Sequence, residues 1–187
     1  MTLERKKTTN VLRDAKHAFG SHDDFPIGPR GTDPMPHLSR SRVAQPFFLV
    51  SAADHVLVQM AGRGVLELRG GPPARLSLAP GDVVYVPAGV PSRASPTPAT
   101  AENANVHVRL KADPPAREAA AWYCRCGELV HAEEVTGDVP QEGYLRAVVA
   151  FNADASLRRC AACGVSHEPV DLDDIAWAAV ASALRAE

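Results

Sequence analysis

Short runs of apolar residues with strand-like alternation dominate the middle of the chain, between residues 46 and 111. The clearest runs are FFLVSAADHVLVQMAG (47–62), VLEL (65–68), ARLSLAP (74–80), DVVYVPAG (82–89) and NVHVRLK (105–111). Turn residues separate them, among them Gly62, Gly64, the Pro80-Gly81 pair and Pro87-Ala88-Gly89. Several short strands at such spacing predict an antiparallel sandwich or barrel.

The pattern changes on both sides of these strands. The first 44 residues are mostly polar and predict one short helix near Asn10 to Phe19, and ADPPAREAA (112–120) has the composition of a linker. The final segment DLDDIAWAAVASALRA (171–186) predicts a closing helix with acidic residues near its N-terminus. We therefore divide the chain into an N-terminal arm (1–45), a barrel (46–112), a linker (113–121), a cysteine module (122–168) and a C-terminal helix (169–187).

The candidate chemistry is concentrated in four cysteines, which form two pairs that are each followed by glycine: Cys124, Cys126, Cys160 and Cys163. The strings WYCRCGEL and RRCAACGVSHEP are typical of two tight turns whose backbone N–H groups point at thiolates. Four thiolates from two such turns make a closed tetrahedral site for one zinc or one iron ion. The first pair has C-x-C spacing, one residue shorter than the usual C-x2-C.

Two disulfides are the alternative interpretation of these cysteines. The N-terminal sequence MTLERKKTTN has no signal-peptide character, so we expect a reducing cytoplasm, where disulfides are disfavoured. The formal net charge of −2 and the scattered basic residues argue against a nucleic-acid partner. No apolar run in the sequence has the length of a membrane helix, so no membrane partner is expected.

Two strings in the strand-rich region, VLVQMAGRGVLEL and SLAPGDVVYVPAGVPSRA, resemble the two motifs of the cupin barrel. With AWYCRCGELVH and RRCAACGVSHEP after a short linker, residues 46–168 resemble the bacterial form of the 3-hydroxyanthranilate 3,4-dioxygenase family. The resemblance implies a double-stranded β-helix (jelly-roll) barrel, a rubredoxin-like four-cysteine module and a homodimer. It also implies ring opening of a small carboxylated aromatic by an iron centre and O₂.

The positions that carry this chemistry in the family have changed here. Matched residue by residue, the first-motif metal ligands fall on Leu49 and His55, the second-motif ligand falls on Ser92, and the substrate-contacting glutamate falls on Arg109. Leucine cannot bind a metal ion, and neutral serine is a poor ligand for ferrous iron. The resemblance therefore implies a divergent member that lacks the catalytic iron ligands, in which a second metal ion in the barrel is not expected.

Strand alternation predicts what the barrel holds instead. Side chains two residues apart share a face, so His55 lies with Gln59, and His107 lies with Arg109. If these faces point inward, they line a pocket with Ser92 and Arg93 at its mouth and without a carboxylate. Arg109 and Arg93 would hold a small anionic or aromatic metabolite by bidentate hydrogen bonds. The two histidines would act as acid and base or join an altered metal site.

Two functional hypotheses remain open at this point. The first is a dioxygenase-like enzyme with His55 and His107 as catalytic residues and a separate structural four-cysteine site. The second is a non-catalytic cupin that serves as a small-molecule-binding or dimerisation platform, in which the polar faces are solvated or structural. Because four cysteines already fill a tetrahedral site, His131 and His167 are interpreted as residues that support the metal ligands or lie on the surface, rather than as ligands. His37 is interpreted as a loop residue near the barrel mouth.

Overall fold

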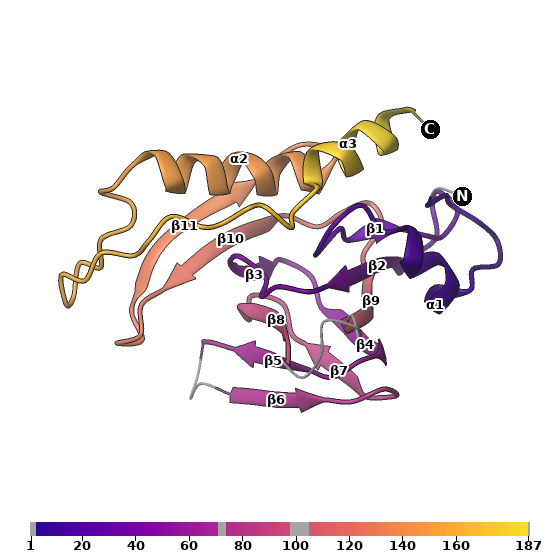
Figure 1. Ribbon diagram of the computed structural model, residues 1–187, viewed down its shortest axis with the longest axis horizontal. Helices are drawn as coiled ribbons and strands as arrows, with labels where there is room; N and C mark the ends of the chain where they lie inside the picture. The colour runs from indigo at the N-terminus through magenta and orange to yellow at the C-terminus, as the bar shows by residue number, and fades with distance from the viewer. Residues whose placement is uncertain (1–2, 71–73, 98–104, 187) are drawn as a thin grey trace.

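The computed structural model describes residues 3–70, 74–97 and 105–186. Two antiparallel sheets face each other, and a layer of two helices covers the extended end of one of them (Figure 1). In sheet order, the first contains β1 (Phe25–Pro26), β2 (Met35–Ser41), β9 (Asn105–Lys111), β4 (His55–Ala61) and β7 (Val83–Val86). The second contains β11 (Leu129–Val135), β10 (Glu118–Tyr123), β3 (Phe48–Ser51), β8 (Ser92–Pro96), β5 (Gly64–Leu68) and β6 (Ala74–Leu78).

The connectivity of eight of these strands is that of a jelly roll. From β2 to β9 the chain crosses from one sheet to the other at every connection except the β5–β6 hairpin, so that β2-β9-β4-β7 faces β3-β8-β5-β6. This is the strand order of a double-stranded β-helix. All pairs within the two sheets are antiparallel. The predicted mainly β fold of the cupin type is thereby confirmed, and each apolar run that predicted a strand contains one.

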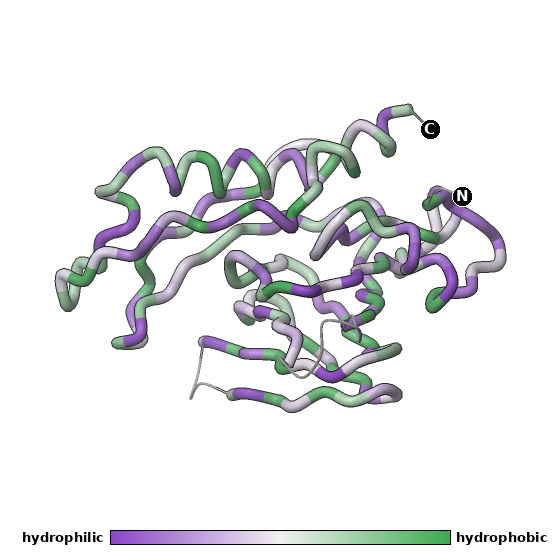
Figure 2. The backbone as a smooth tube through the Cα atoms, in the orientation of Figure 1, coloured by the Kyte–Doolittle hydropathy of each residue, from purple (hydrophilic) through white to green (hydrophobic). Residues whose placement is uncertain are grey.

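The middle of the barrel is filled by aliphatic side chains. Leu57 and Val86 from the first sheet meet Leu66, Leu78 and Ala94 from the second, and each is at most 4% exposed. Hydrophobic and hydrophilic residues interleave along these strands, as the alternation of a strand between an inner and an outer face requires (Figure 2). Close packing of branched side chains holds the two sheets together here.

The N-terminal segment contributes more than an arm. The predicted short helix is present as α1 (Val11–Asp14) followed by a 3₁₀ turn, η1 (Ala15–His17). Met35–Ser41, inside the segment expected to precede the barrel, forms strand β2 and pairs along its whole length with β9. Its sequence MPHLSRS has few strand-forming residues, and pairing with a central strand overrides that weak preference.

The C-terminal part is joined to the barrel rather than set apart from it. Strand β10 begins within the predicted linker and pairs with β3, so the β10–β11 hairpin extends the second sheet. Helix α2 (Pro140–Ala153) lies between the two cysteine pairs, and α3 (Trp177–Ala186) forms the predicted closing helix, beginning later than expected. Helix α2 lies over the hairpin, and α3 extends beyond it toward the N-terminal segment, where Val180 packs with Phe25 and Leu38 (Figure 1).

An aromatic cluster fills the space between this layer and the barrel. Trp122 of β10 stacks on Phe151 of α2 with ring centroids 4.2 Å apart, and Phe47 contacts Trp122, Tyr144 and Trp177. Burying several aromatic rings in one cluster makes a large contribution to stability. Two segments that are distant in sequence, the start of β3 and the helices, are therefore parts of one core.

Candidate functional site

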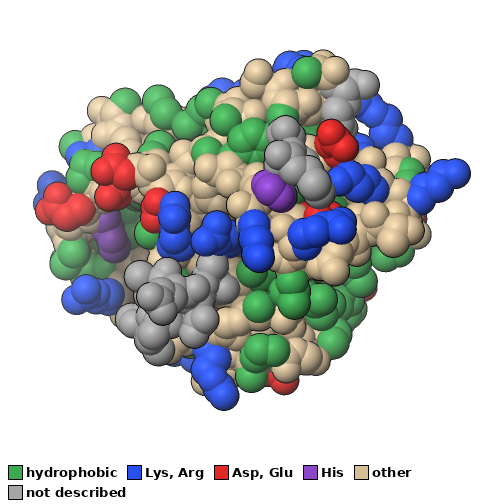
Figure 3. Space-filling view, turned by 45° about the vertical axis from the view of Figure 1, so that its right-hand side comes forward, with side chains coloured by type: hydrophobic (Ala, Val, Ile, Leu, Met, Phe, Trp, Pro, Cys, Tyr) green, Lys and Arg blue, Asp and Glu red, His purple; other side chains and the backbone are tan. Residues whose placement is uncertain are grey.

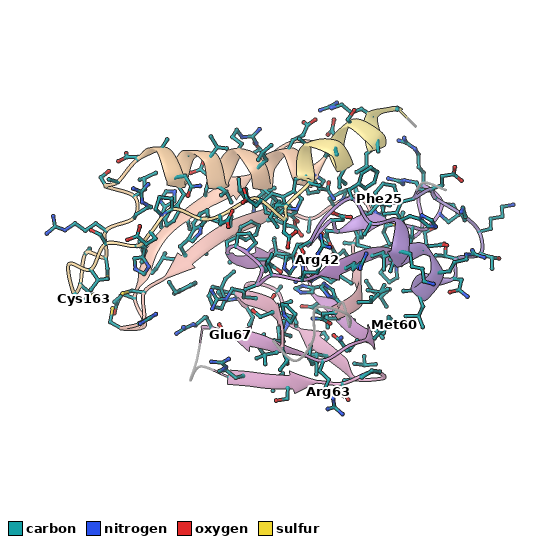
Figure 4. All side chains as sticks on the ribbon, viewed as in Figure 1. Phe25, Arg42, Met60, Arg63, Glu67 and Cys163 are labelled. Carbon is teal, nitrogen blue, oxygen red and sulfur yellow. The ribbon has the colours of Figure 1, made fainter. Side chains whose placement is uncertain are left out.

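The four cysteines converge at the tip of the C-terminal layer, where Cys163 is labelled in Figure 4. Their sulfur atoms all lie within 4.8 Å of one another, with Sγ–Sγ distances of 3.5 Å for Cys124–Cys163 and 3.6 Å for Cys126–Cys160. Sulfurs placed 2.3 Å from a central zinc at tetrahedral angles are about 3.8 Å apart. The predicted ligand set is therefore brought together with dimensions that fit one zinc or iron ion.

Both cysteine turns have the hydrogen bonds of a metal knuckle. The Gly127 N–H donates to the Cys124 carbonyl at 3.0 Å, and the Gly164 N–H donates to the Cys160 carbonyl at 2.9 Å. Both glycines have positive φ, of 103° and 74°, which a glycine adopts without strain. The N–H groups of Cys163 and Ala162 also donate to the Cys160 sulfur and lower the pKa of that thiol to about 7. Backbone N–H groups favour the thiolates of Cys126 and Cys163 as well, but their contacts with the other thiols raise the pKa of both. Metal binding takes the thiolate form of all four.

The two histidines near this site have different roles. His131 stacks on Trp122 with ring centroids 5.9 Å apart and lies 3.4 Å from the Glu133 carboxylate, so it belongs to the aromatic cluster. His167 lies on the wall of a surface groove beside the knuckles. Neither is part of the group of converging sulfurs.

The inner face of the first sheet carries the polar residues predicted from alternation. Register places side chains in rows across the strands: His107 lies between Gln59 and Ser39, and Arg109 lies between Leu57 and His37. All of these polar side chains are at most 7% exposed. The prediction of an inward face containing His55, Gln59, His107 and Arg109 agrees with this arrangement. His37 is a strand residue opposite Arg109 and not a loop residue.

The same register separates the two histidines expected to act together. Gln59 is opposite His107, and His55 lies four residues before Gln59 on β4, about 13 Å away along the strand. The row containing Leu57 and Arg109 lies between them. His55 and His107 are therefore not placed to act as an acid–base pair on one atom or to share a metal ion.

The two residues expected at the barrel mouth lie on opposite faces of β8. Ser92 is fully buried and pairs with Leu68 across the strands, so it faces inward. Arg93 faces outward, donates to the Glu67 carboxylate at 2.6 Å and lies over the Phe48 ring at 4.7 Å. The expectation that Arg93 lines the barrel pocket is corrected, because neighbouring residues of a strand point to opposite faces.

Two buried carboxylates lie inside the barrel, contrary to expectation. Asp24 belongs to the predicted N-terminal arm and Glu118 to the predicted linker. Lys111 forms ion pairs with Asp24 at 2.8 Å and with Glu118 at 2.7 Å, and Glu118 also accepts a hydrogen bond from Tyr144. Although burial opposes ionisation, the positive charges of Lys111 and Arg109 hold the pKa of Asp24 well below its usual range. This set of Asp24, Lys111, Glu118 and Tyr144 is called the buried ion network below.

Arg109 is consequently not an open anion site. Its guanidinium donates to the Gln45 side-chain oxygen at 2.7 Å, and Asp24 provides a nearby negative charge. Arg109, Asp24 and Gln45 border a cavity of about 10 Å³. That volume holds about one water molecule, so it excludes a carboxylated aromatic ring.

Buried imidazoles distinguish the barrel interior from an ordinary aliphatic core. Among the described residues, neither ring nitrogen of His55 or of His107 has a hydrogen-bond partner, and the Ser92 hydroxyl also has none. Burial lowers the pKa of His55 to about 3 and the pKa of His22 to about 4, with the charge of Arg109 acting in the same direction. Burial also lowers the pKa values of His37 and His107, so these imidazoles are neutral near pH 7.

These shifts predict that the protein loses stability in mild acid. Below pH 6.5 the unfolded chain binds more protons on these four histidines than the folded chain does, so the free energy of unfolding falls as pH falls. Asp23 acts in the opposite direction, because burial raises its pKa to about 7 and the folded chain therefore binds one proton that the unfolded chain does not. The net loss is at least about 1.4 kcal/mol per pH unit between pH 6.5 and 5. Urea titrations across this range measure it.

A paired variant identifies the source of this slope. His55→Gln removes one of the buried imidazoles and should flatten the pH dependence by up to about 1.4 kcal/mol per unit, whereas His17→Gln, at a partly exposed position in η1, should not change it. A stability that stays constant or rises between pH 6.5 and 5 would contradict this account.

The barrel does not provide a catalytic iron site. Within the described ranges, the four cysteines are the one group of three or more His, Cys, Asp or Glu side chains close enough to hold a metal ion. Leu49 of β3 packs in the aromatic cluster, and Ser92 of β8 is its cross-strand partner. These are the two positions that the sequence resemblance matched to metal ligands. The residues present therefore do not fit an iron ion in the barrel.

No family model matches the sequence, and the curated proteins searched contain no match. Solved structures with partial similarity include hydroquinone 1,2-dioxygenase PnpCD in complex with Fe³⁺, at 12% identity and a TM-score of 0.49, covering 61% of this chain and 38% of that one. A cupin-2 domain protein from Shewanella frigidimarina has 16% identity and a TM-score of 0.45, covering 55% and 93%. Because these identities and TM-scores are low, the fold assignment rests on the strand order of the two sheets. Membership of the 3-hydroxyanthranilate dioxygenase family stays a prediction.

Helices that meet the length and hydropathy needed to cross a bilayer do not occur in the described part of the chain. Cytoplasmic location stays a prediction from the sequence.

Proposed function

We propose that this chain is a non-catalytic cupin-type protein that binds a small anionic metabolite, with a structural metal ion in its four-cysteine site. The observation that carries the proposal is the barrel interior. Leu57, Leu66 and Val86 fill its centre, and the register separates His55 from His107. The barrel then acts as a rigid support for surfaces outside it.

The metal ion has a structural role in this proposal. Four thiolates complete a tetrahedral coordination shell and leave no position for a substrate. The site connects the end of β10 to the loop after α2, which are far apart in the sequence. When bound, the ion supplies folding free energy to this layer.

A divergent oxygenase is the second candidate, favoured by the ring nitrogens of His55 and His107, which have no hydrogen-bond partner within the part of the chain that the structure describes. Two buried imidazoles without hydrogen-bond partners are uncommon, because such groups usually have protein or water partners. In this candidate the altered barrel still activates a carboxylated aromatic.

An oxygen-uptake assay separates the two candidates. Protein loaded anaerobically with ferrous iron should not consume O₂ above the rate of free iron when given 3-hydroxyanthranilate, because Leu49 and Ser92 do not supply ligands. Iron-dependent turnover that His55→Gln or His107→Gln abolishes would contradict the proposal and support the oxygenase.

The homodimer implied by the resemblance is retained as part of the proposal. Val83 and Tyr85 of edge strand β7 are 65% and 58% exposed, and hydrophobic side chains gather over the lower part of the molecule, where the barrel strands lie (Figure 3). Such surfaces are found at protein interfaces. Sedimentation velocity of Val83→Asp against wild type tests it, and two monomeric samples would contradict it.

A further inference from the structure

A groove of about 730 Å³ runs between the outer face of the second sheet and the cysteine knuckles. Its walls come from β3, β8 and the end of β10 on one side and from the loop after the second cysteine pair on the other. Three guanidinium groups line it, those of Arg69, Arg93 and Arg125. This volume is within the range of small-molecule sites, roughly 300–1,000 Å³, and far exceeds that of the cavity beside Arg109.

Aromatic rings hold two of these guanidinium groups in place. The Arg69 guanidinium lies 5.4 Å from the Phe48 centroid and 5.7 Å from the Tyr123 centroid, and the Arg93 guanidinium lies 4.7 Å from the Phe48 centroid. Phe48 and Tyr123 themselves meet edge to face at 5.3 Å. A guanidinium stacked on a ring keeps its N–H edge free for a planar oxyanion, and its ordering before binding reduces the entropy lost on binding.

The positive charge of this set is only partly neutralised. Arg93 donates to Glu67, but its Nε is buried and has no hydrogen-bond partner among the described residues. Within those same residues, neither Arg69 nor Arg125 forms an ion pair. Glu168 is the acidic residue on the groove wall. Guanidinium groups without an ion pair are therefore available to an oxyanion, and the rings beside them favour an apolar body attached to that anion.

We infer that this groove is the ligand site, and that its ligand is a small organic anion with a carboxylate or phosphate group on an apolar ring. Arg69 contacts the oxyanion, Arg93 supports it, and Phe48 and Tyr123 contact the ring. The inference deepens the proposed binding function and rests on it. It transfers anion recognition from Arg109, where the sequence predicted it, to the outer face of the barrel.

An alternative role for the arginines is to offset the charge of the metal site. A zinc ion with four thiolates has a net charge of −2, and Cys126 and Cys163 lie on the groove wall. In that case Arg69→Ala would weaken metal binding and leave ligand binding unchanged. The two roles thus predict different outcomes for one variant.

Calorimetry of the metal-loaded full chain with benzoate, phenyl phosphate and uncharged benzamide tests the inference. We expect benzoate or phenyl phosphate to bind at millimolar concentration and benzamide to bind much more weakly; the stronger of the two anions identifies the oxyanion. Arg69→Ala should weaken binding about tenfold or more, since it removes a charge-assisted contact. Arg63→Ala removes the same charge at a position away from the groove (Figure 4) and should bind as wild type does.

Metal content and melting temperature of Arg69→Ala show whether the variant is folded. If it is misfolded, Arg69→Lys, which keeps the charge but loses the planar fork, should still weaken binding. Unchanged anion binding in folded Arg69→Ala, absence of binding by both anions, or equally tight binding of benzamide would overturn the inference. Iron-dependent oxygen uptake would contradict the proposed function instead, so the two failures are distinguishable.

Discussion

Cys160→Ser is expected to abolish stoichiometric metal binding and to unfold most of the C-terminal layer. Its sulfur is one of four that converge within 4.8 Å, and its thiol has the lowered pKa suited to metal binding. Binding free energies of structural metal ions in such peptides are of order 10 kcal/mol and act as folding free energy. Hydrogen exchange should show lost protection in β11 and α2 and retained protection in β4 and β9.

A matched control is available in the same turn. Ala161→Ser adds a hydroxyl beside the site without removing a ligand, and should keep both the metal ion and the melting temperature. Some loss of protection in β3 is also expected for Cys160→Ser, because β10 pairs with β3 and Trp122 contacts Phe47. Undiminished metal content and unchanged melting of Cys160→Ser would show that the cysteines are not ligands.

Lys111→Met should lower the free energy of unfolding by about 3–5 kcal/mol, because it leaves Asp24 and Glu118 as uncompensated buried charges. For a chain of this size the melting temperature should fall by roughly 6–20 °C. The double variant Lys111→Met/Glu118→Gln should be less destabilised than the sum of its single variants, because two charges leave together. Urea unfolding of wild type, Lys111→Met, Glu118→Gln and the double variant measures this coupling.

Lys16→Met is the surface control for this comparison, since Lys16 is exposed in η1 and should change stability little. Burial opposes the charge of Lys111, yet Asp24 and Glu118 raise its pKa well above the usual value. The network therefore stabilises the fold below the pKa of an unfolded lysine, and this contribution is lost as pH rises through the folded value. A Lys111→Met protein as stable as wild type would mean that the ion pairs contribute nothing.

The barrel strands and the four-cysteine site followed from local sequence, because both have short-range signals. Alternating Val and Leu runs bounded by Gly and Pro indicated β4 to β7 and β9, and cysteine pairs followed by glycine indicated the knuckles. Strand β2 was missed because MPHLSRS has a weak strand preference, and its strand conformation depends on pairing with the distant strand β9 along its whole length. Helix α2 was not predicted, because its N-cap Val139 supplies no capping hydrogen bond and Gly143, Val148 and Val149 have low helix propensity.

The chemistry of the barrel interior depended on contacts that the sequence pattern does not specify. Alternation correctly placed His55, Gln59 and His107 on an inward face, but could not show how far apart register sets them. Asp24 and Glu118 reach Lys111 from segments 87 and 7 residues away, a pairing produced only by the folded chain. The groove was missed because its arginines and rings come from four separate segments.

The number of metal ions per chain tests the central claim most directly. Protein purified without affinity-tag chelation and exposed anaerobically to excess ferrous iron and zinc should retain one metal ion per chain after desalting, held by the four cysteines. The Cys160→Ser variant should retain none. The account would be contradicted by two metal ions per chain. If one of them survives in Cys160→Ser and is lost in His55→Gln or His107→Gln, the barrel binds metal.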